Sequence, residues 1–286
     1  MRCIRLAAAV LVAAAVIPAA ADELIERGEY LARAGGCVEC HTADSDDAIP
    51  LAGGRELVTP FGTFYTPNIT PDPATGIGGW SEADFLRASW EGVSPAGEHY
   101  YPAFPYPAYT GLTRDDLLAI RAWLAGVEPV VSETPDHELA WYIATRLAAG
   151  AWKLAHFAAG RFVPEPGRSP EWNRGAYLVR HLGHCGECHT PRGRTGALVA
   201  DRELGGATLP DGERVPNITP HDDDGIGRWT TGDIEYFLDV GMLPDGDFTG
   251  GSMSAVIDSA TSVLTREDRL AVAVYLQSLP ALPARD

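Results

Sequence analysis

A five-residue motif occurs twice in this chain, as Cys37-Val-Glu-Cys40-His41 and as Cys185-Gly-Glu-Cys188-His189. The chain has five cysteines, and the four beyond Cys3 all lie in these two motifs. C-x-x-C-H is the attachment signature of c-type haem, in which two thiols become thioethers and the adjacent histidine reaches the iron. The sequence therefore predicts two covalently bound haem c groups, attached through Cys37, Cys40, Cys185 and Cys188, with His41 and His189 as proximal iron ligands.

Other uses of paired cysteines fit this pattern less well. A thioredoxin-type C-x-x-C does not require the histidine. A structural zinc site gathers four ligands in closed tetrahedral geometry, whereas the two motifs are about 148 residues apart in the chain. An oxidising compartment would be the only reason to expect disulfide bonds, because the spacing of the cysteines does not indicate them. The histidine that follows both cysteine pairs favours haem.

The amino terminus has the order of a secretory signal peptide. Arg2 and Arg5 precede an apolar run over residues 6–17, and small residues follow it before Asp22. This order predicts a signal peptide over residues 1–21 that is cleaved after Ala21. The run is too short to cross about 30 Å of hydrocarbon. We expect a periplasmic chain, soluble or peripherally associated with a membrane complex, with no membrane-spanning segment after cleavage.

The formal charge of −17 limits the partners of the chain. A strongly acidic protein is repelled by nucleic acid and by anionic membrane surfaces. The excess of acidic residues instead favours a basic docking partner, or only keeps the protein soluble.

Several landmarks around the two motifs recur at nearly constant spacing. Arg27-Gly-Glu-Tyr-Leu precedes the first motif and Arg174-Gly-Ala-Tyr-Leu the second, while Pro67-Asn-Ile-Thr-Pro71 recurs as Pro216-Asn-Ile-Thr-Pro220. A repeat that covers most of a chain indicates a duplicated fold. We predict an all-α protein of two tandem cytochrome c domains, residues 22–126 and 171–286, joined by a partly helical connector over residues 127–170 that packs the halves together.

Each copy reads as short helices between loops rich in glycine and proline, without a convincing strand pattern. Helices over residues 24–34 and 174–182 are expected to deliver the cysteines, and the connector is expected to be helical over residues 137–159. An N-cap hydroxyl followed three residues later by an acid predicts capping boxes. Four such pairs occur, namely Ser81 with Asp84, Thr113 with Asp116, Thr230 with Asp233, and Thr265 with Asp268.

The sixth iron ligand of the second haem is predicted from the methionines. The chain has three, Met1, Met242 and Met253. Met253 lies about a dozen residues before the last predicted helix, where cytochrome c domains carry the loop with the distal ligand. A Met thioether opposite histidine raises the reduction potential of a haem. We predict Met253 as this ligand, with Met242 as the alternative.

The first copy has no methionine in the equivalent loop, which carries Phe104. Phenylalanine cannot coordinate iron, so the first haem either takes another ligand or is left five-coordinate. His99 is the leading candidate, because it is the only histidine within residues 22–126 besides His41. A surface role or a contact with a haem propionate explains His99 equally well, and the tyrosines of the loop are weaker candidates.

These residues carry a resemblance to a known family. The stretch over residues 65–80, then Tyr101-Pro-Ala-Phe-Pro-Tyr106, and then Gly183-His-Cys-x-x-Cys-His-Thr-Pro-Arg192, are similar to cytochrome c subunits of periplasmic alcohol, gluconate and aldehyde dehydrogenases. The resemblance implies an electron-transfer subunit and Met253 as a distal ligand. The chain departs from it in two ways: many relatives have a third haem domain and a membrane-associated tail, and relatives with Pro-Ala-Met-Pro-Tyr have methionine where Phe104 stands.

Two functions of different class follow. The chain relays electrons from a periplasmic dehydrogenase to an acceptor of the respiratory chain, or it is itself a dihaem redox enzyme, of thiosulfate dehydrogenase or peroxidase type, that uses an open site on the first haem. A catalytic site should place acid–base groups near the iron. The aromatic, proline-rich loop around Phe104 favours the relay, with no catalytic residue of its own.

Overall fold

The computed structural model describes residues 16–283. Cys3 and most of the predicted signal peptide, residues 1–15, lie outside the described residues, as do residues 284–286. The first helix, α1, spans Val16–Ala34 and so includes the predicted cleavage position after Ala21. The predicted helix over residues 24–34 is confirmed as the second part of α1.

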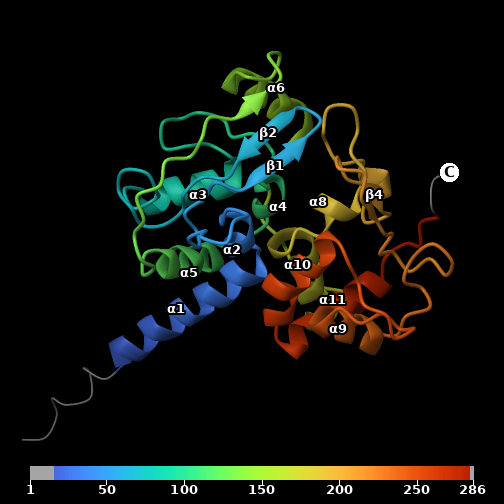
Figure 1. The fold of residues 1–286 in the computed structure, drawn as a ribbon. Helices are drawn as coiled ribbons and strands as arrows, with labels where there is room; N and C mark the ends of the chain where they lie inside the picture. Colours follow the sequence, from blue (N-terminus) through green and yellow to red (C-terminus); the bar gives the residue numbers. More distant parts are fainter. Residues whose placement is uncertain (1–15, 284–286) are drawn as a thin grey trace, which may run out of the picture.

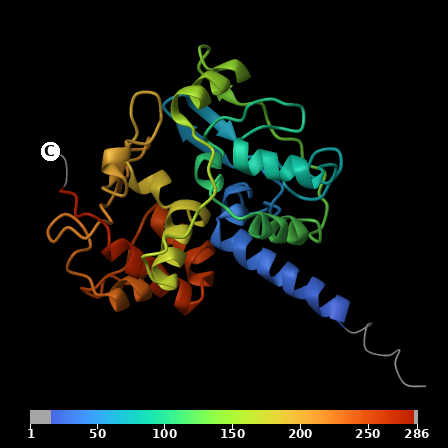
Figure 2. The same cartoon turned by 180° about the vertical axis from the view of Figure 1, so that it is seen from behind.

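The fold is mostly helical, as predicted. The copies of the repeat lie side by side in Figures 1 and 2, with the first in blue to green and the second in yellow to red. The first copy contains α2 (Cys37–Cys40), α3 (Glu82–Glu91), α4 (Tyr106–Tyr109) and α5 (Arg114–Leu124). The second copy contains α7 (Pro170–Tyr177), a π-helical turn (Leu178–Leu182), α8 (Gly186–His189), α9 (Thr231–Val240), α10 (Ser252–Ser259) and α11 (Arg266–Gln277), with 3₁₀ turns at Ala200–Arg202 and Thr261–Val263.

In each copy the helix that leads to the cysteines packs against the last helix of that copy. Helix α1 packs on α5, and α7 packs on α11. The backbones meet at Gly28 and Gly175, where an added Cβ would lie 2.0 Å from the carbonyl oxygen of Ala119 and 1.9 Å from that of Ala271. The glycine of the repeated Arg-Gly-x-Tyr-Leu segment therefore permits a close helix crossing in both copies.

The sequence shows no convincing strand pattern and therefore predicts no strands, and this prediction is wrong. Strands β1 (Glu56–Thr59) and β2 (Gly62–Tyr65) form an antiparallel hairpin, which β3 (Glu138–Leu139) extends, and β4 (Ala207–Thr208) pairs with β5 (Arg214–Val215). Each strand has two to four residues. The two-residue strands are too short to show alternation, and β1 and β2 have only the minimum of four residues at which a period-two pattern can be recognised.

The connector is helical over only part of the predicted range. Helix α6 spans Arg146–His156, whereas residues 137–145 contain strand β3 and turns. The backbone N–H of Tyr65 donates to His137 Nδ1 at 3.2 Å, and that of Ala140 donates to the carbonyl of Phe61 at 2.9 Å. Pairing with the hairpin thus prevents the helix from starting at His137.

The connector contacts both copies, as expected. Trp152 Nε1 on α6 donates to the carbonyl of Thr195 in the second copy at 2.9 Å, while Lys153 Nζ donates to the carbonyl of Gly92 in the first copy at 2.9 Å.

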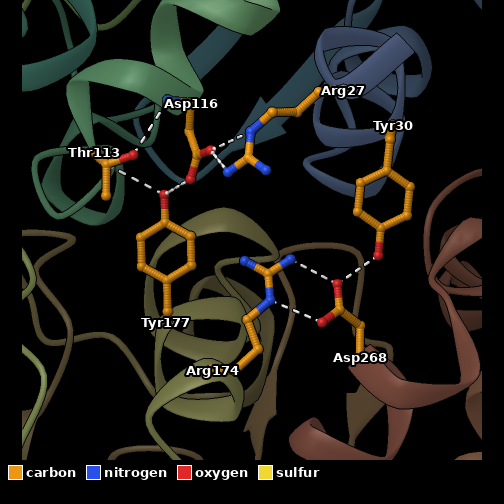
Figure 3. Close-up of polar contacts among 7 residues, drawn as sticks. All are labelled: Arg27, Tyr30, Thr113, Asp116, Arg174, Tyr177 and Asp268. Atoms are coloured by element: carbon orange, nitrogen blue, oxygen red, sulfur yellow. Dashed lines mark hydrogen bonds and ion pairs between the residues drawn. The ribbon is translucent and has the colours of Figure 1, made fainter. Parts of the chain in front are cut away.

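Two of the four predicted capping boxes form and two do not. Ser81 with Asp84 and Thr230 with Asp233 make both hydrogen bonds of the box. At Thr113 and Thr265 the hydroxyl accepts the backbone N–H three residues on, but the carboxylates of Asp116 and Asp268 turn away from the cap. These two acids instead bind an arginine of their own copy and a tyrosine of the other copy (Figure 3).

The apolar core continues from one copy into the other. Leu31 and Leu112 of the first copy belong to the same buried cluster as Val179 and Leu276 of the second. Across residues 16–283, no helix combines the length and the apolar character that crossing a membrane requires.

Candidate haem sites

Both C-x-x-C-H motifs form the same tight helical turn. The backbone N–H of His41 donates to the carbonyl of Cys37 at 3.0 Å, and that of His189 donates to the carbonyl of Cys185 at 3.0 Å. One helical turn separates the two cysteines of each motif, so that both thiols lie on one face. The predicted attachment residues are therefore brought together within each copy.

The two histidines are oriented by the same kind of contact. Nδ1 of His41 lies 2.7 Å from the carbonyl oxygen of Pro67, and Nδ1 of His189 lies 2.8 Å from that of Pro216. A ring that donates its Nδ1–H to a carbonyl keeps the lone pair of Nε2 free for a metal. Burial lowers the pKa of both histidines, against the opposing effect of these hydrogen bonds, which favours the neutral ligand form.

The repeated Pro-Asn-Ile-Thr-Pro loop fixes the position of these carbonyls. Oδ1 of Asn68 accepts the backbone N–H of Thr70 at 2.9 Å, and Oδ1 of Asn217 accepts that of Thr219 at 2.8 Å. The Asn68 amide donates to the carbonyl of Val130 at 2.7 Å, which anchors the loop to the segment after the last helix of the copy. Sequence reasoning treated these loops as repeat landmarks only, although their identical recurrence was the signal for this role.

The four thiols suit thioether formation better than redox catalysis. None of the four is in a disulfide. Burial raises the pKa of Cys37 to about 12 and that of Cys185 to about 12, whereas oxidoreductase cysteines have a lowered thiol pKa. Within the described part of the chain, no group of three or more His, Cys, Asp or Glu side chains is arranged to hold a metal ion. The turn, the paired thiols and the free Nε2 fit covalent haem c.

The two candidate methionine ligands occupy different surroundings. Met253, on α10, is partly buried and packs against the core cluster. Met242 bridges to Phe248 across a turn, and Phe248 is 63% exposed. Helix α10 also lies beside α2. The surroundings of Met253 are those of a side chain directed inward, and its role as ligand stays a prediction.

The loops that carry Phe104 and Met253 begin alike, although Met253 lies within α10 and Phe104 precedes α4. A turn begins each loop, with the N–H of Tyr100 donating to the carbonyl of Gly92 at 2.8 Å and that of Thr249 donating to the carbonyl of Gly241 at 2.9 Å. Counting from these turns, Phe104 occupies the position of Met253. By the same register His99 corresponds to Phe248, as the two matching bridges show.

Phe104 lies within a cluster of aromatic rings. Its ring centroid is 5.7 Å from that of Tyr100, 6.5 Å from that of Tyr106 and 5.7 Å from that of Tyr109. The hydroxyl of Tyr109 donates to the carbonyl of Gly35, two residues before Cys37, at 3.1 Å. The cluster therefore reaches the first attachment motif and supplies rings there.

His99 faces the connector helix. Its Nδ1 lies 3.1 Å from Lys153 Nζ, and an added Cβ at Gly150 would lie 2.7 Å from its ring. An imidazole that accepts from an ammonium group at Nδ1 carries its proton on Nε2. For His99 to bind iron through Nε2, its contact with Lys153 would have to change. The role of His99 as a ligand stays a prediction.

Comparison with curated proteins finds relatives over nearly the whole chain. A protein named "Diheme cytochrome c-type" from Cereibacter sphaeroides is 44% identical over 90% of this chain and 86% of its own length. The cytochrome c subunit of a quinone-type alcohol dehydrogenase from Gluconacetobacter polyoxogenes is 39% identical, over 95% of this chain and 59% of its own. The gluconate 2-dehydrogenase cytochrome c subunit of Pantoea cypripedii is 41% identical, over 92% and 61%. No family model matches the chain.

Proposed function

Since the chain belongs to the family of dihaem c-type cytochromes, we propose that it relays electrons from a periplasmic dehydrogenase to the respiratory chain. The observation that carries the proposal is the pair of C-x-x-C-H turns, each beside a histidine that a proline carbonyl orients. The names of the alcohol and gluconate dehydrogenase subunits support a dehydrogenase as the electron donor. The chain spans about three fifths of the length of these two subunits.

The proposal assigns attachment residues and iron ligands to each haem. Cys37 and Cys40 hold one haem and Cys185 and Cys188 the other, with His41 and His189 as proximal ligands. Met253 is the sixth ligand of the second haem, because it packs inward where Met242 bridges to an exposed ring. At the first haem the sixth position is filled by His99 or left open. Bound haem supplies one-electron redox chemistry, and the chain supplies ligands and an apolar surrounding.

The organisation of the mature chain is proposed with it. A signal peptide over residues 1–21 directs the chain to the periplasm, where domains over residues 22–126 and 171–286 fold around one haem each and residues 127–170 connect them. The protein is soluble there or bound peripherally to a membrane complex.

The relay is preferred to the catalytic alternative on one specific ground. A haem enzyme requires acid–base groups that act on a substrate beside the iron. The rings of Tyr106 and Tyr109 pack beside Phe104. Burial raises the pKa of both phenols above the ordinary range. Such phenols stay protonated at neutral pH and are poor bases.

The proposal is tested on the purified holoprotein. Alkaline pyridine spectra should give two haem c groups per chain, and the oxidised protein should be reduced when the catalytic subunit of a quinone-dependent alcohol or gluconate dehydrogenase turns over its substrate. Membrane vesicles that contain a respiratory chain should then reoxidise it. Failure of all such subunits to reduce the protein, together with rapid binding of cyanide or carbon monoxide, would replace the relay with the enzymatic alternative.

A further inference from the structure

The segments that carry the two attachment motifs touch each other at one carbonyl group. The carbonyl oxygen of Gly35 accepts a hydrogen bond from Tyr109 Oη at 3.1 Å and lies 3.4 Å from His184 Nε2. Gly35 is two residues before Cys37, and His184 directly precedes Cys185. A route of covalent bonds and one polar contact thus connects the attachment cysteines of the two copies.

The side chains at this contact also pack on one another. The rings of Tyr109 and His184 lie 5.5 Å apart at an interplanar angle of 66°, an edge-to-face arrangement that aromatic pairs favour. Burial raises the pKa of Tyr109 well above its ordinary value. Because Tyr109 bonds to Gly35 before the first motif and packs on His184 before the second, it lies close to both motifs at once.

The backbone at His184 is strained to make this contact. His184 has φ +36°, in the left-handed region that side chains rarely adopt. Its counterpart in the first copy is Gly36, with φ +71°, where an added Cβ would have nothing within 4 Å. The second copy therefore carries a side chain where glycine would relieve the strain. A residue kept in such a conformation points to a function of its side chain.

We propose that Tyr109 and His184 are positioning residues that hold the two attachment segments together at Gly35, so that an electron passes directly between the two haems of one chain. The proposal deepens the proposed relay and rests on it only for the presence of two haems. One electron is exchanged: the iron of one site is oxidised as the iron of the other is reduced, and no bond is made or broken.

The test compares His184→Gly and Tyr109→Phe with the original holoprotein. His184→Gly gives the second copy the glycine of the first and removes the ring, while Tyr109→Phe removes only the hydroxyl. After rapid one-electron reduction by pulse radiolysis, the rate at which the electron redistributes between the haems is followed optically. Each variant should slow this step on the order of tenfold, because the rate of electron transfer falls steeply once the two attachment segments are no longer held in contact. Tyr142→Phe, an exposed residue of the connector, should leave the rate unchanged.

Haem content, the two reduction potentials and the paramagnetic interaction between the oxidised haems are measured in each protein. The rates are compared between proteins that bind both haems and have the same difference in reduction potential. A slower rate then reflects the lost contact and not a change in potential. An unchanged rate and an unchanged paramagnetic interaction in Tyr109→Phe overturn the proposal, and this variant decides the matter if His184→Gly fails to fold. No dehydrogenase takes part, so failure of the relay itself would show only in the reduction assay with the dehydrogenase subunits.

Discussion

The phenol of Tyr30 donates a hydrogen bond to the carboxylate of Asp268, although 238 residues separate them in the chain. The reciprocal contact also forms, with Tyr177 donating to Asp116 at 2.5 Å. Arg174 binds Asp268 through Nε at 2.7 Å and Nη2 at 2.6 Å. Each copy thus provides one acid that accepts an arginine from its own copy and a tyrosine from the other (Figure 3).

Removing either phenol should weaken the contact between the copies. A hydrogen bond to a charged group contributes more than one between neutral groups, so Tyr30→Phe and Tyr177→Phe should each lower the free energy of unfolding by about 1.5 kcal/mol. Denaturant unfolding of the holoprotein measures this. Tyr236→Phe, a partly exposed residue on α9, should change it by less than about 0.5 kcal/mol. If Tyr30→Phe and Tyr236→Phe have equal free energies of unfolding, the hydrogen bond from Tyr30 to Asp268 contributes nothing to stability.

Acid should weaken the same contact. Burial raises the pKa of Asp268, but hydrogen bonds from Arg174 and Tyr30 outweigh it, so the pKa lies below the ordinary value of 3.8. A carboxyl group with a lowered pKa in the folded state stabilises the fold above the unfolded value, and this contribution is lost as the pH falls through the folded value. The free energy of unfolding should therefore drop below about pH 4.

Substitution of the acid should flatten this dependence. Measured between pH 3 and pH 6, the unfolding free energy of Asp268→Asn should fall less steeply with acid than that of the original protein. Asp47→Asn, an exposed substitution, provides the control. A slope that Asp268→Asn leaves intact would assign acid sensitivity to other groups.

The helix crossings at Gly28 and Gly175 should tolerate no side chain. Their added Cβ atoms would lie 2.0 Å and 1.9 Å from backbone oxygens of the facing helix, which cannot move as a flexible side chain can. Gly28→Ala and Gly175→Ala should each lower the free energy of unfolding by about 1–3 kcal/mol through overpacking. Gly160→Ala, with nothing within 4 Å of its Cβ, should have almost no effect in the same denaturation experiment. Full stability of either crossing variant would contradict the close approach.

Loss of the Met253 thioether should change one haem only. Met253→Ala should lower the reduction potential of one haem and abolish the weak near-infrared band of the methionine–iron bond, because the thioether favours the reduced state. Redox titration with near-infrared spectroscopy of the oxidised protein detects both changes. Met242→Leu keeps a hydrophobic side chain and should retain the band. If Met242→Leu loses the band instead, the ligand is Met242.

Restoring methionine at Phe104 tests the register of the two loops. Phe104 occupies the position that Met253 takes in the second copy, next to rings that reach the first attachment motif. Phe104→Met should therefore add a second near-infrared methionine–iron band and raise the potential of the first haem. Phe104→Leu, which cannot coordinate iron, serves as the control and should add no band. Absence of a new band in Phe104→Met would contradict the assigned register of the two loops.

Sequence reasoning could reach what local chemistry specifies. The C-x-x-C-H motifs, the helices before them and the N-caps at Ser81 and Thr230 depend on residues one helical turn apart, so that spacing alone predicts them. The short strands and the true start of α6 were missed, because they depend on backbone pairing between residues far apart in sequence.

The two attachment motifs, the duplication and the mostly helical class follow from residue types at fixed spacing along the chain. The tertiary structure sets what Asp116 and Asp268 bind: their spacing from a threonine predicts a capping box, but arginine and a tyrosine from the other copy compete for the same carboxylate. It likewise decided that Gly35, Tyr109 and His184 meet, because the contact depends on how the two copies pack together. Local spacing specifies the two C-x-x-C-H motifs, and long-range packing sets their relation.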